Sequence, residues 1–498
     1  MSSNAYGQLE QRFARMGALN EAAGMLHWDM AAVMPEGGHE SRAEQLATLN
    51  VISHEMLTSA EMADLLALAG DSGLDEWQRA NLHEMKRIYV HATALRPDLV
   101  EAITRARAAC EKTWRAARPA GDFAMVQPKL QAVLDLFRES AAAKAEKLGI
   151  SPYDALMDEF EPGARAADIT PVFDDYAAFL PEFLGKVLEK QARLGPAIAA
   201  KGPFSIPSQK ALGEKLMATI GFDFNHGRLD TSLHPFCGGT PDDVRITTRY
   251  NEDQFADALM GVVHETGHAM YERGLPIQWR RQPVGQARGM ALHESQSLII
   301  EMQAARSLAF CRYLSPLLNE TYPGNDAAFA PDNLARAYTK VEPGFIRVSA
   351  DEVTYPAHVI LRYRLEQALI SGDLKLADLP GAWNDGMKQL LGLTVTNDRE
   401  GCLQDIHWFD GLFGYFPCYS LGAMTAAQFF AAALRDVPGI PAAIEAGDFS
   451  PLIGWLRTHV HGRGSSLTTP EIVRAATGKP LDAAIFRRHL EQRYLAEA

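Results

Sequence analysis

Apolar residues recur every three or four positions over most of the chain, which is the spacing of one face of an α-helix. Within residues 6–23 this spacing is set by Leu9, Phe13, Met16 and Leu19. Residues 75–148 show the same pattern with a break at Pro97, and a further helical segment covers residues 169–194. The spacing returns in residues 425–498. The pattern therefore predicts a mainly α-helical protein.

The pattern changes between residues 227 and 250, where glycine and proline become frequent and residues 243–247 alternate polar and apolar side chains. Alternation with a period of two is typical of a β-strand with one buried face. We therefore expect a small antiparallel β-sheet immediately before the next helix. Such a sheet could pair with an extended peptide backbone, or it could be a short structural hairpin.

The length of 498 residues would by itself suggest about three domains. However, no stretch has the composition of a Gly/Ser-rich or charged linker, an internal repeat or a low-complexity tract. We therefore expect a single unit over residues 1–498. Residues 1–226 would form the scaffold and one wall of a cleft, and residues 227–498 would carry the chemistry.

Composition and charge exclude several classes of protein. Hydrophobic residues make up 47% of the chain and charged residues 22%, as in a soluble globular protein. The formal net charge of −14 argues against nucleic-acid binding, because phosphate groups would be repelled. Residues 1–15 lack the apolar core of a signal peptide and no run of about 18 apolar residues occurs, so we expect a cytoplasmic protein without membrane contact. Five cysteines, an odd number, favour free thiols.

The sequence His-Glu-Thr-Gly-His at residues 264–268 is a candidate metal site. Residues four apart lie on one face of a helix, so His264 and His268 can bind the same ion. Glu265 lies beside them, where a general base would be needed. Asn251 and Gln254 are expected to cap this helix. The alternative is a pair of ordinary histidines.

A third ligand is expected in the next helical segment. Glu294 would complete a set of two histidines and one carboxylate, which leaves a fourth tetrahedral position for water, as in a catalytic zinc site. Glu301, seven residues later, is a rival ligand or a partner of a ligand. Glu272, four residues after His268, is a weaker rival.

Two further segments are rich in groups that could contact a substrate. Arg347 has apolar neighbours, and a guanidinium in such surroundings needs an anion. The anion could be Asp351, four residues later, or a substrate carboxylate. Residues 401–422 combine aromatic and hydrogen-bonding side chains, a composition that alone would indicate protein core.

Taken together, the motifs resemble the M32 metallocarboxypeptidases, which are typified by carboxypeptidase Taq. The blocks that carry the resemblance are His-Pro-Phe at residues 234–236, Asp-Val-Arg-Ile-Thr at 243–247, His-Glu-Thr-Gly-His at 264–268, His-Glu-Ser-Gln-Ser at 293–297, Ile-Arg-Val-Ser-Ala-Asp at 346–351 and Gly-Cys-Leu-Gln-Asp-Ile-His-Trp at 401–408. They follow the order of the family. The segments around Trp28 and at residues 153–163 are similar to the family as well, so the resemblance covers most of the chain.

The resemblance implies a helical zincin-type peptidase with a deep cleft and a small sheet beside the active-site helix. It implies a peptide substrate, from which single amino acids are removed at the free carboxyl end. It further implies one zinc ion per chain, with cobalt possible, and a homodimer. The ion would be bound by His264, His268 and Glu294, with Glu265 as the general base.

The resemblance also implies roles for residues whose chemistry is open from the sequence alone. Arg347 would bind the terminal carboxylate of the substrate. The remaining substrate-binding candidates are His234, Asp243, Arg245 and Thr247, of which the last three would close the cleft near the carboxyl end of the substrate. The candidates for stabilising the oxyanion are His407, Tyr415 and Tyr419. Cys418 and Ala423 depart from the family pattern and could alter hydrogen bonding near the tyrosines.

Other functions fit parts of the sequence. An endopeptidase or a dipeptidase could use the same metal residues. A di-iron oxidoreductase is suggested by Glu265 and His268, which form Glu-x-x-His, but the second such motif that this class requires is not found. A non-catalytic scaffold would not need Glu265. Outside the motifs, we expect Trp28 to be a buried aromatic with a local hydrogen-bond partner and His461 to be exposed to solvent.

Overall fold

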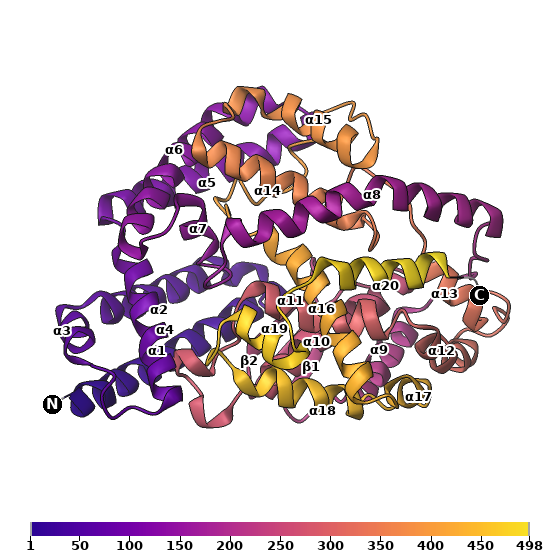
Figure 1. Cartoon of the computed structure of the whole chain (residues 1–498), viewed down its shortest axis with the longest axis horizontal. Coiled ribbons are helices and arrows are strands. Elements are labelled where there is room, and N and C mark those ends of the chain that lie inside the picture. Colours follow the sequence, from indigo (N-terminus) through magenta and orange to yellow (C-terminus); the bar gives the residue numbers. More distant parts are fainter. Residues whose placement is uncertain (1, 497–498) are drawn as a thin grey trace.

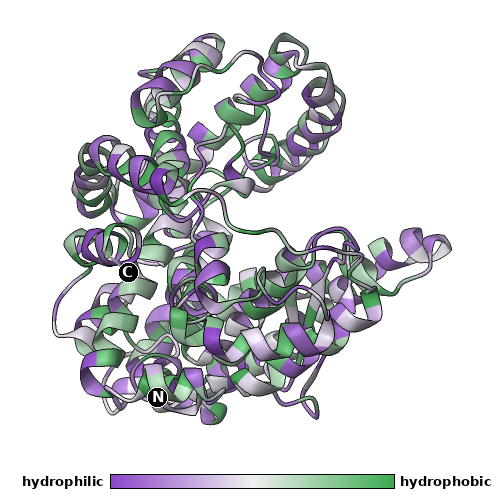
Figure 2. Ribbon diagram, turned by 90° about the vertical axis from the view of Figure 1, so that its right-hand side faces the viewer, coloured by the Kyte–Doolittle hydropathy of each residue, from purple (hydrophilic) through white to green (hydrophobic). Residues whose placement is uncertain are grey.

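The structure, a computed structural model, describes residues 2–496 and is built mainly from α-helices (Figure 1). Hydrophilic and hydrophobic residues alternate along these helices (Figure 2), so the helices have both polar and apolar sides. This is the amphipathic pattern that the sequence predicts, and the mainly α-helical fold is confirmed. No helix among the described residues is long and apolar enough to cross a lipid bilayer.

The helices that precede the sheet lie mostly on the left and in the upper part of Figure 1, and the last of them lies at the lower right. They are α1 (Ser2–Ala32), α2 (His39–Thr58), α3 (Ala60–Leu68), α4 (Glu76–Thr93), α5 (Pro97–Ala120), α6 (Phe123–Leu148), α7 (Pro152–Met157), α8 (Ala166–Leu194) and α9 (Ile206–Ile220). The break predicted at Pro97 is confirmed, because this proline is the first residue of α5, where its missing N–H is not needed.

Helices α10 to α20 follow the sheet. They are α10 (Ala256–Gly274), α11 (Met290–Leu298), α12 (Leu308–Thr321), α13 (Pro331–Tyr338), α14 (Tyr355–Ser371), α15 (Leu379–Leu391), α16 (Pro417–Asp436), α17 (Ile440–Glu445), α18 (Ser450–His459), α19 (Thr469–Thr477) and α20 (Ala483–Leu495). A π-helical turn, Ile299–Ala304, continues α11 directly. Short 3₁₀ turns lie at Glu36–Gly38, Ile277–Trp279, Pro283–Gly285, Arg347–Ser349, Leu376–Asp378 and His461–Arg463.

The sheet consists of β1 (Gly227–Thr231), β2 (Phe236–Thr240) and β3 (Asp243–Thr248), with β3 in the middle. β2 pairs with β3 in the antiparallel sense, but β1 pairs with β3 in the parallel sense. The predicted antiparallel sheet is therefore wrong in one of its two pairings. The physical reason is that β1 skips β2 and pairs with the other edge of β3, so a chain that reverses direction between β1 and β2 and again between β2 and β3 leaves β1 parallel to β3.

Two large hydrophobic cores meet at α11. One core is formed mainly by α5, α6, α8, α14 and α15, and the other mainly by α9, α10, α12, α16 and α18. Ala291 is buried in the first core, whereas Leu292 is buried in the second. A smaller core joins α1, α3 and α4, and another lies beneath the sheet. The position of α11 is thus fixed by packing on both sides.

Helix α10 begins later than the sequence predicts. Asn251 does not cap it, because Asn251 Oδ1 accepts a hydrogen bond from the backbone N–H of Asp253 in a separate turn, at 2.9 Å. Instead, Gln254 Oε1 accepts a hydrogen bond from the N–H of Asp257, also at 2.9 Å. Gln254 therefore covers the first turn of α10. The predicted cap is wrong because the backbone between Asn251 and Ala256 is not helical.

Candidate functional site

His264 and His268 lie one turn apart on α10 and face the same side, as their spacing predicts. Glu294 of α11 reaches both of them: its Oε2 is 3.8 Å from His264 Nε2 and 3.6 Å from His268 Nε2. The ligand atoms of the three residues lie within 4.8 Å of one another. Two imidazole nitrogens and a carboxylate oxygen fit a divalent metal such as zinc and leave a fourth position for water. These residues could therefore hold a metal ion.

Helix α11 can pack this close to α10 and α16 because each of these two helices has a glycine at the point of contact. A Cβ atom at Gly267 of α10 would lie 2.4 Å from the carbonyl oxygen of Gln296. On the opposite side, a Cβ atom at Gly422 of α16 would lie 2.8 Å from the Cβ of Glu294. A larger residue at either position would have to displace α11, and Glu294 with it.

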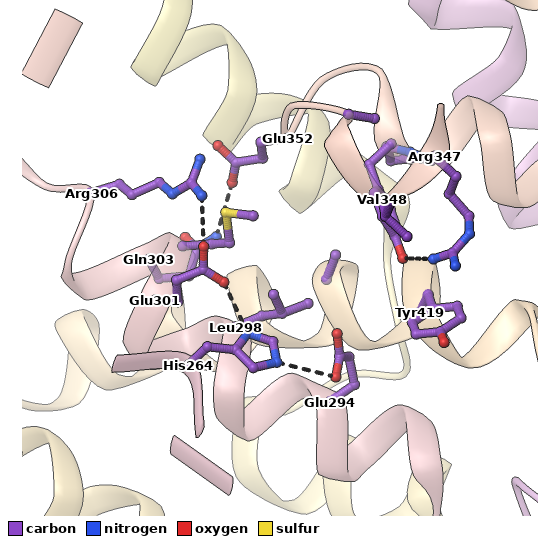
Figure 3. A pocket seen from close by; sticks show the side chains of 15 residues that line it. His264, Glu294, Leu298, Glu301, Gln303, Arg306, Arg347, Val348, Glu352 and Tyr419 are labelled. Atoms are coloured by element: carbon purple, nitrogen blue, oxygen red, sulfur yellow. Dashed lines mark hydrogen bonds and ion pairs between the residues drawn. The ribbon is translucent and has the colours of Figure 1, made fainter. Parts of the chain in front are cut away.

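Glu301 contacts His264 at Nδ1, on the side of the ring away from Glu294, and does not join the three candidate metal ligands. Its Oε2 lies 2.9 Å from His264 Nδ1, and its Oε1 accepts a hydrogen bond from Arg306 Nη2 at 2.6 Å (Figure 3). Burial opposes ionisation of Glu301, but Arg306 and His264 outweigh it and lower its pKa to about 2. Of the two alternatives for Glu301, the geometry therefore favours the partner of a ligand over the ligand itself.

His268 is held from the other side by a second histidine. Its Nδ1 lies 2.7 Å from Nδ1 of His293, and Nε2 of His293 lies 2.8 Å from Glu272 Oε1. If His268 binds a metal through Nε2, its Nδ1 carries the proton and donates it to His293, which in turn donates to Glu272. Glu272 is thus engaged with His293 and does not join the metal residues. No sequence pattern predicts the contacts of this relay.

Glu265 follows His264 on α10 and is only 7% exposed. Burial raises its pKa to about 7. The carboxylate lies in the electrostatic range of His264, Glu294 and His293. Its position next to the metal residues is the one that the sequence predicts.

A cavity of about 310 Å³ is lined by His264 and Glu294, and Arg347 lies on its far side (Figure 3). The remaining wall includes apolar residues such as Leu298, Val348 and Pro356, and it also carries the charged side chains of Arg306 and Glu352. The cavity therefore combines two metal-site residues, Arg347 and a wall of mixed polarity.

Arg347 is buried, with 5% of its surface exposed, and its anion is Asp405. Arg347 Nη2 donates to Asp405 Oδ1 at 2.8 Å and Arg347 Nη1 donates to the hydroxyl of Tyr355 at 2.6 Å. The same carboxylate also accepts a hydrogen bond from Arg362 Nε at 2.7 Å. Asp351, the partner considered from the sequence, binds the backbone N–H groups of residues 353 and 354 instead.

Asp405 and Tyr355 were therefore missed by sequence reasoning. The only sequence signal for Asp405 is its position in the block at residues 401–408, between the hydrogen-bonding residues Gln404 and His407. Asp405 lies between two guanidiniums, and these outweigh the effect of burial and hold its pKa well below the usual range. The three charged groups together carry one net positive charge.

The three oxyanion candidates form one cluster, and Tyr419 lines the cavity. His407 Nε2 lies 3.3 Å from the hydroxyl of Tyr419, and the ring of Tyr415 packs edge-on against that of Tyr419 with centroids 5.2 Å apart. Burial, reinforced by Arg347 and Arg362, lowers the pKa of His407 to about 4. His407 is therefore neutral near neutral pH.

The substrate-binding candidates on the sheet lie apart from this cavity and have partners within the protein. Arg245 forms an ion pair with Asp243 at 2.7 Å, and its guanidinium covers the ring of Trp28 at 4.4 Å. Thr247 is buried, and its Oγ1 accepts a hydrogen bond from the N–H of Phe236 at 3.1 Å. His234 is exposed in the connection between β1 and β2.

Two predictions outside the motifs need correction. Trp28 is buried as expected, but its Nε1 has no hydrogen-bond partner within residues 2–496; the ring is held by guanidiniums instead. His461 is not exposed: it is 1% accessible, and its Nε2 lies 3.0 Å from Oε1 of Gln296 in the helix segment after Glu294. The fold buries His461 by packing the turn after α18 against α10.

A second cavity, of about 510 Å³, lies between α1, β2 and the loop before α11. His293 and Glu272 line it, together with Cys237 of β2 and Arg281. The smaller cavity is lined by His264 and Glu294, and the larger one by His293 and Glu272. His293 contacts His268, so it lies between the larger cavity and a metal residue.

Comparison with known proteins agrees with this geometry. The family model described as carboxypeptidase Taq (M32) metallopeptidase matches residues 8–494. The thermostable carboxypeptidase 1 of Thermus thermophilus is 35% identical, with 99% of this chain and 98% of that protein covered. The carboxypeptidase 1 of Bacillus subtilis is 32% identical, with 96% of each chain covered.

Solved structures are similar over the same length. The structure of Trypanosoma cruzi metallocarboxypeptidase 1 matches with a TM-score of 0.97 and 41% identity, covering 99% of this chain and 100% of that one. The M32 carboxypeptidase from Deinococcus radiodurans matches with a TM-score of 0.93 and 33% identity, covering 99% of each chain. These relatives do not favour a di-iron oxidoreductase or a non-catalytic scaffold. The chain belongs to the M32 family of metallopeptidases and is a metal-dependent carboxypeptidase.

Proposed function

We propose that this enzyme uses zinc, one ion per chain, bound by His264, His268 and Glu294, and that it releases single amino acids from the free carboxyl end of peptides. Cobalt could take the same position. The observation that carries the proposal is that His264, Glu294 and Arg347 line one cavity of about 310 Å³. This volume is at the lower end for ligand pockets and suits a single terminal residue.

The chemistry requires an electrophile at the carbonyl oxygen, an activated water and a proton for the departing amine. When bound, the metal would polarise the carbonyl group and lower the pKa of a coordinated water. Glu265 would accept the proton of the attacking water and pass it to the leaving nitrogen. His407, Tyr415 and Tyr419 are candidates for donating a hydrogen bond to the oxyanion, and a neutral His407 can do so through one N–H.

Arg347 would recognise the terminal carboxylate of the peptide. A guanidinium has five N–H groups, and three of those of Arg347 are used by Asp405 and Tyr355. Two therefore remain for a substrate carboxylate. Because Arg347, Arg362 and Asp405 carry one net positive charge, the cluster attracts an anion while Asp405 holds Arg347 in place.

The upstream part of the peptide would follow the sheet. β2 lies at the edge of the sheet beside the larger cavity, where an extended backbone could pair with it. Asp243, Arg245 and Thr247, to which the family motif assigns the closing of the cleft, would line this part of it together with His234. The ion pair with Asp243 would hold the Arg245 side chain in place when a peptide enters.

We further propose that the whole chain is one functional unit, that two chains form a homodimer and that the enzyme acts in the cytoplasm. The first point is supported by α11, which packs into both large cores at once. The other two follow from family membership and from the composition of the chain.

The decisive experiment compares an amino-terminally blocked peptide with a free carboxyl end and its amidated twin. The wild type should release single residues from the free acid only. Glu265→Gln should retain metal, as measured by elemental analysis, but lose roughly 100- to 10,000-fold in kcat. Arg347→Ala should raise KM for the free acid.

Each proposed role can fail separately. Equal cleavage of the amidated peptide would remove the role of Arg347 and indicate an endopeptidase. Full activity of Glu265→Gln would refute its role as the base. A metal content far from one ion per chain would refute the proposed site.

A further inference from the structure

We infer that Glu161 is a positioning residue that fixes the metal-ligand helix α11 from outside, by capping its amino-terminal end. Glu161 lies in the segment at residues 153–163, to which the chemistry described above assigns no role. The inference rests on the proposed role of Glu294 as a metal ligand.

Helix α11 has no side chain of its own to cap its first turn. Its N-cap residue is Gly289, and the first backbone N–H groups of a helix have no partner within the helix. The segment before α8 supplies the partners. The N–H of Met290 donates to the carbonyl oxygen of Phe160 at 2.8 Å, and the N–H of Ala291 donates to Glu161 Oε2 at 2.8 Å. The carboxylate also accepts a hydrogen bond from the N–H of Leu292.

Glu161 is buried where its two carboxylate oxygens can serve two segments at once. It is 5% exposed, and its second oxygen accepts a hydrogen bond from the hydroxyl of Thr469 in the first turn of α19. A negative charge at the amino-terminal end of a helix is also favourable for the helix dipole. The carboxylate therefore joins the start of α11 to two segments from distant parts of the chain.

Gly289 provides an independent sign that this contact is specific. A Cβ atom at Gly289 would lie 2.5 Å from Glu161 Oε2. The backbone of Gly289 is extended, with φ of −161°, so its conformation suits any residue. A side chain at this position would therefore have to displace the carboxylate, although the backbone itself does not require glycine.

The consequence for the metal site follows from the length of α11. His293 and Glu294 lie in the turn directly after the capped residues, so both move with the start of the helix. His293 contacts His268, and Glu294 is the third metal residue. Loss of the cap should therefore disturb one metal residue directly and a second through its partner.

The test uses Glu161→Ala and Glu161→Gln, with Thr469→Val as the matched control. Thr469→Val removes a partner of Glu161 but leaves the helix cap intact. The readouts are the metal dissociation constant from chelator competition and the visible absorption spectrum of the cobalt-loaded protein. Both are recorded at a temperature where circular dichroism shows the variant to be folded.

We expect Glu161→Ala to weaken metal affinity by about 10- to 100-fold and to change the cobalt spectrum, as partners of metal ligands do. Glu161→Gln, which keeps one acceptor oxygen, should lie between Glu161→Ala and wild type, and Thr469→Val should match wild type. If neither Glu161 variant folds, Gly289→Ala replaces them, because it forces a methyl group against the carboxylate. It should likewise weaken metal affinity and change the cobalt spectrum. Wild-type affinity and spectrum in a folded Glu161 or Gly289 variant would overturn the inference.

Glu294→Ala separates this inference from the proposed function. If Glu294→Ala leaves metal affinity unchanged, the proposed ligand set is wrong and the inference falls with it. If Glu294→Ala abolishes metal binding while Glu161→Ala does not weaken it, only the role of Glu161 is refuted.

Discussion

Replacing Asp405 with asparagine tests the charge cluster that holds Arg347. The carboxylate is the shared anion of two guanidiniums: Arg362 is fully buried, and the side chain of Arg347 is 6% exposed. Asparagine has nearly the same shape but no charge, so the variant leaves two like charges buried without an anion. The change should therefore affect both the stability of the protein and the recognition of substrate.

The expected size of the effect follows from the burial. Removing one partner of a buried ion pair costs about 3–5 kcal/mol, because the remaining charge stays desolvated. This is a large share of the roughly 5–15 kcal/mol that stabilises a typical folded protein. For catalysis, weakening a hydrogen bond to a charged group by roughly 1.5–3 kcal/mol corresponds to about a 10- to 100-fold rise in KM for a free-acid peptide.

The assay combines urea unfolding with steady-state kinetics. Arg362→Met provides the control in a double-mutant cycle: alone it should destabilise the protein, but added to Asp405→Asn it should cost little, because it removes one of the two unpaired charges. An Asp405→Asn variant within about 1 kcal/mol of the wild type, with unchanged KM, would show that the cluster is not what holds Arg347.

Three further predictions concern separate parts of the site. His293→Phe should weaken metal affinity about 10- to 100-fold in chelator competition, whereas His293→Gln, which can accept and donate, should retain most of it; equal affinities would contradict the relay. Because burial lowers the pKa of His407 to about 4 from 6.5, the folded state resists protonation, and stability is lost as the pH falls through this range. The free energy of unfolding should be measured by urea unfolding at a series of pH values. His407→Gln should lose roughly 3 kcal/mol less than the wild type as the pH falls through this range. The same dependence of unfolding free energy on pH in both proteins would refute the prediction. Removing the metal with a chelator should abolish activity and lower the thermal midpoint, and zinc or cobalt should restore both; activity without metal would contradict the mechanism.

The sequence was informative wherever the signal is local. Helix periodicity and the position of Pro97 depend on neighbouring residues, and the predicted helices are present. The sense of the β1 pairing depends on which strand β1 joins: it skips β2, its neighbour along the chain, and pairs with β3, and no local pattern reports this. This is why the strands could be predicted and the sense of one pairing could not.

In the site, too, contacts set by local spacing could be predicted, whereas contacts between residues far apart in the sequence could not. The spacing of His264 and His268 places them on one helix face, and the structure brings Glu294 to them. The partner of Arg347 lies 58 residues away in the sequence, and the partner of His461 lies 165 residues away. Asp351 was the nearest acidic residue considered for Arg347, but proximity along the chain does not determine which carboxylate the fold buries beside it.

The rivalry between Glu294 and Glu301 shows how backbone geometry decides what spacing leaves open. Seven residues along a regular α-helix return to nearly the same face, so both carboxylates would point the same way. In the structure α11 changes into a π-helical turn at Ile299, between the two residues. The wider turn shifts the direction of Glu301, which then reaches the back of His264 at Nδ1 while Glu294 faces Nε2. Because π-helical turns occur often at functional sites, this irregularity fits a function in which one glutamate approaches the metal position and the other orients an imidazole.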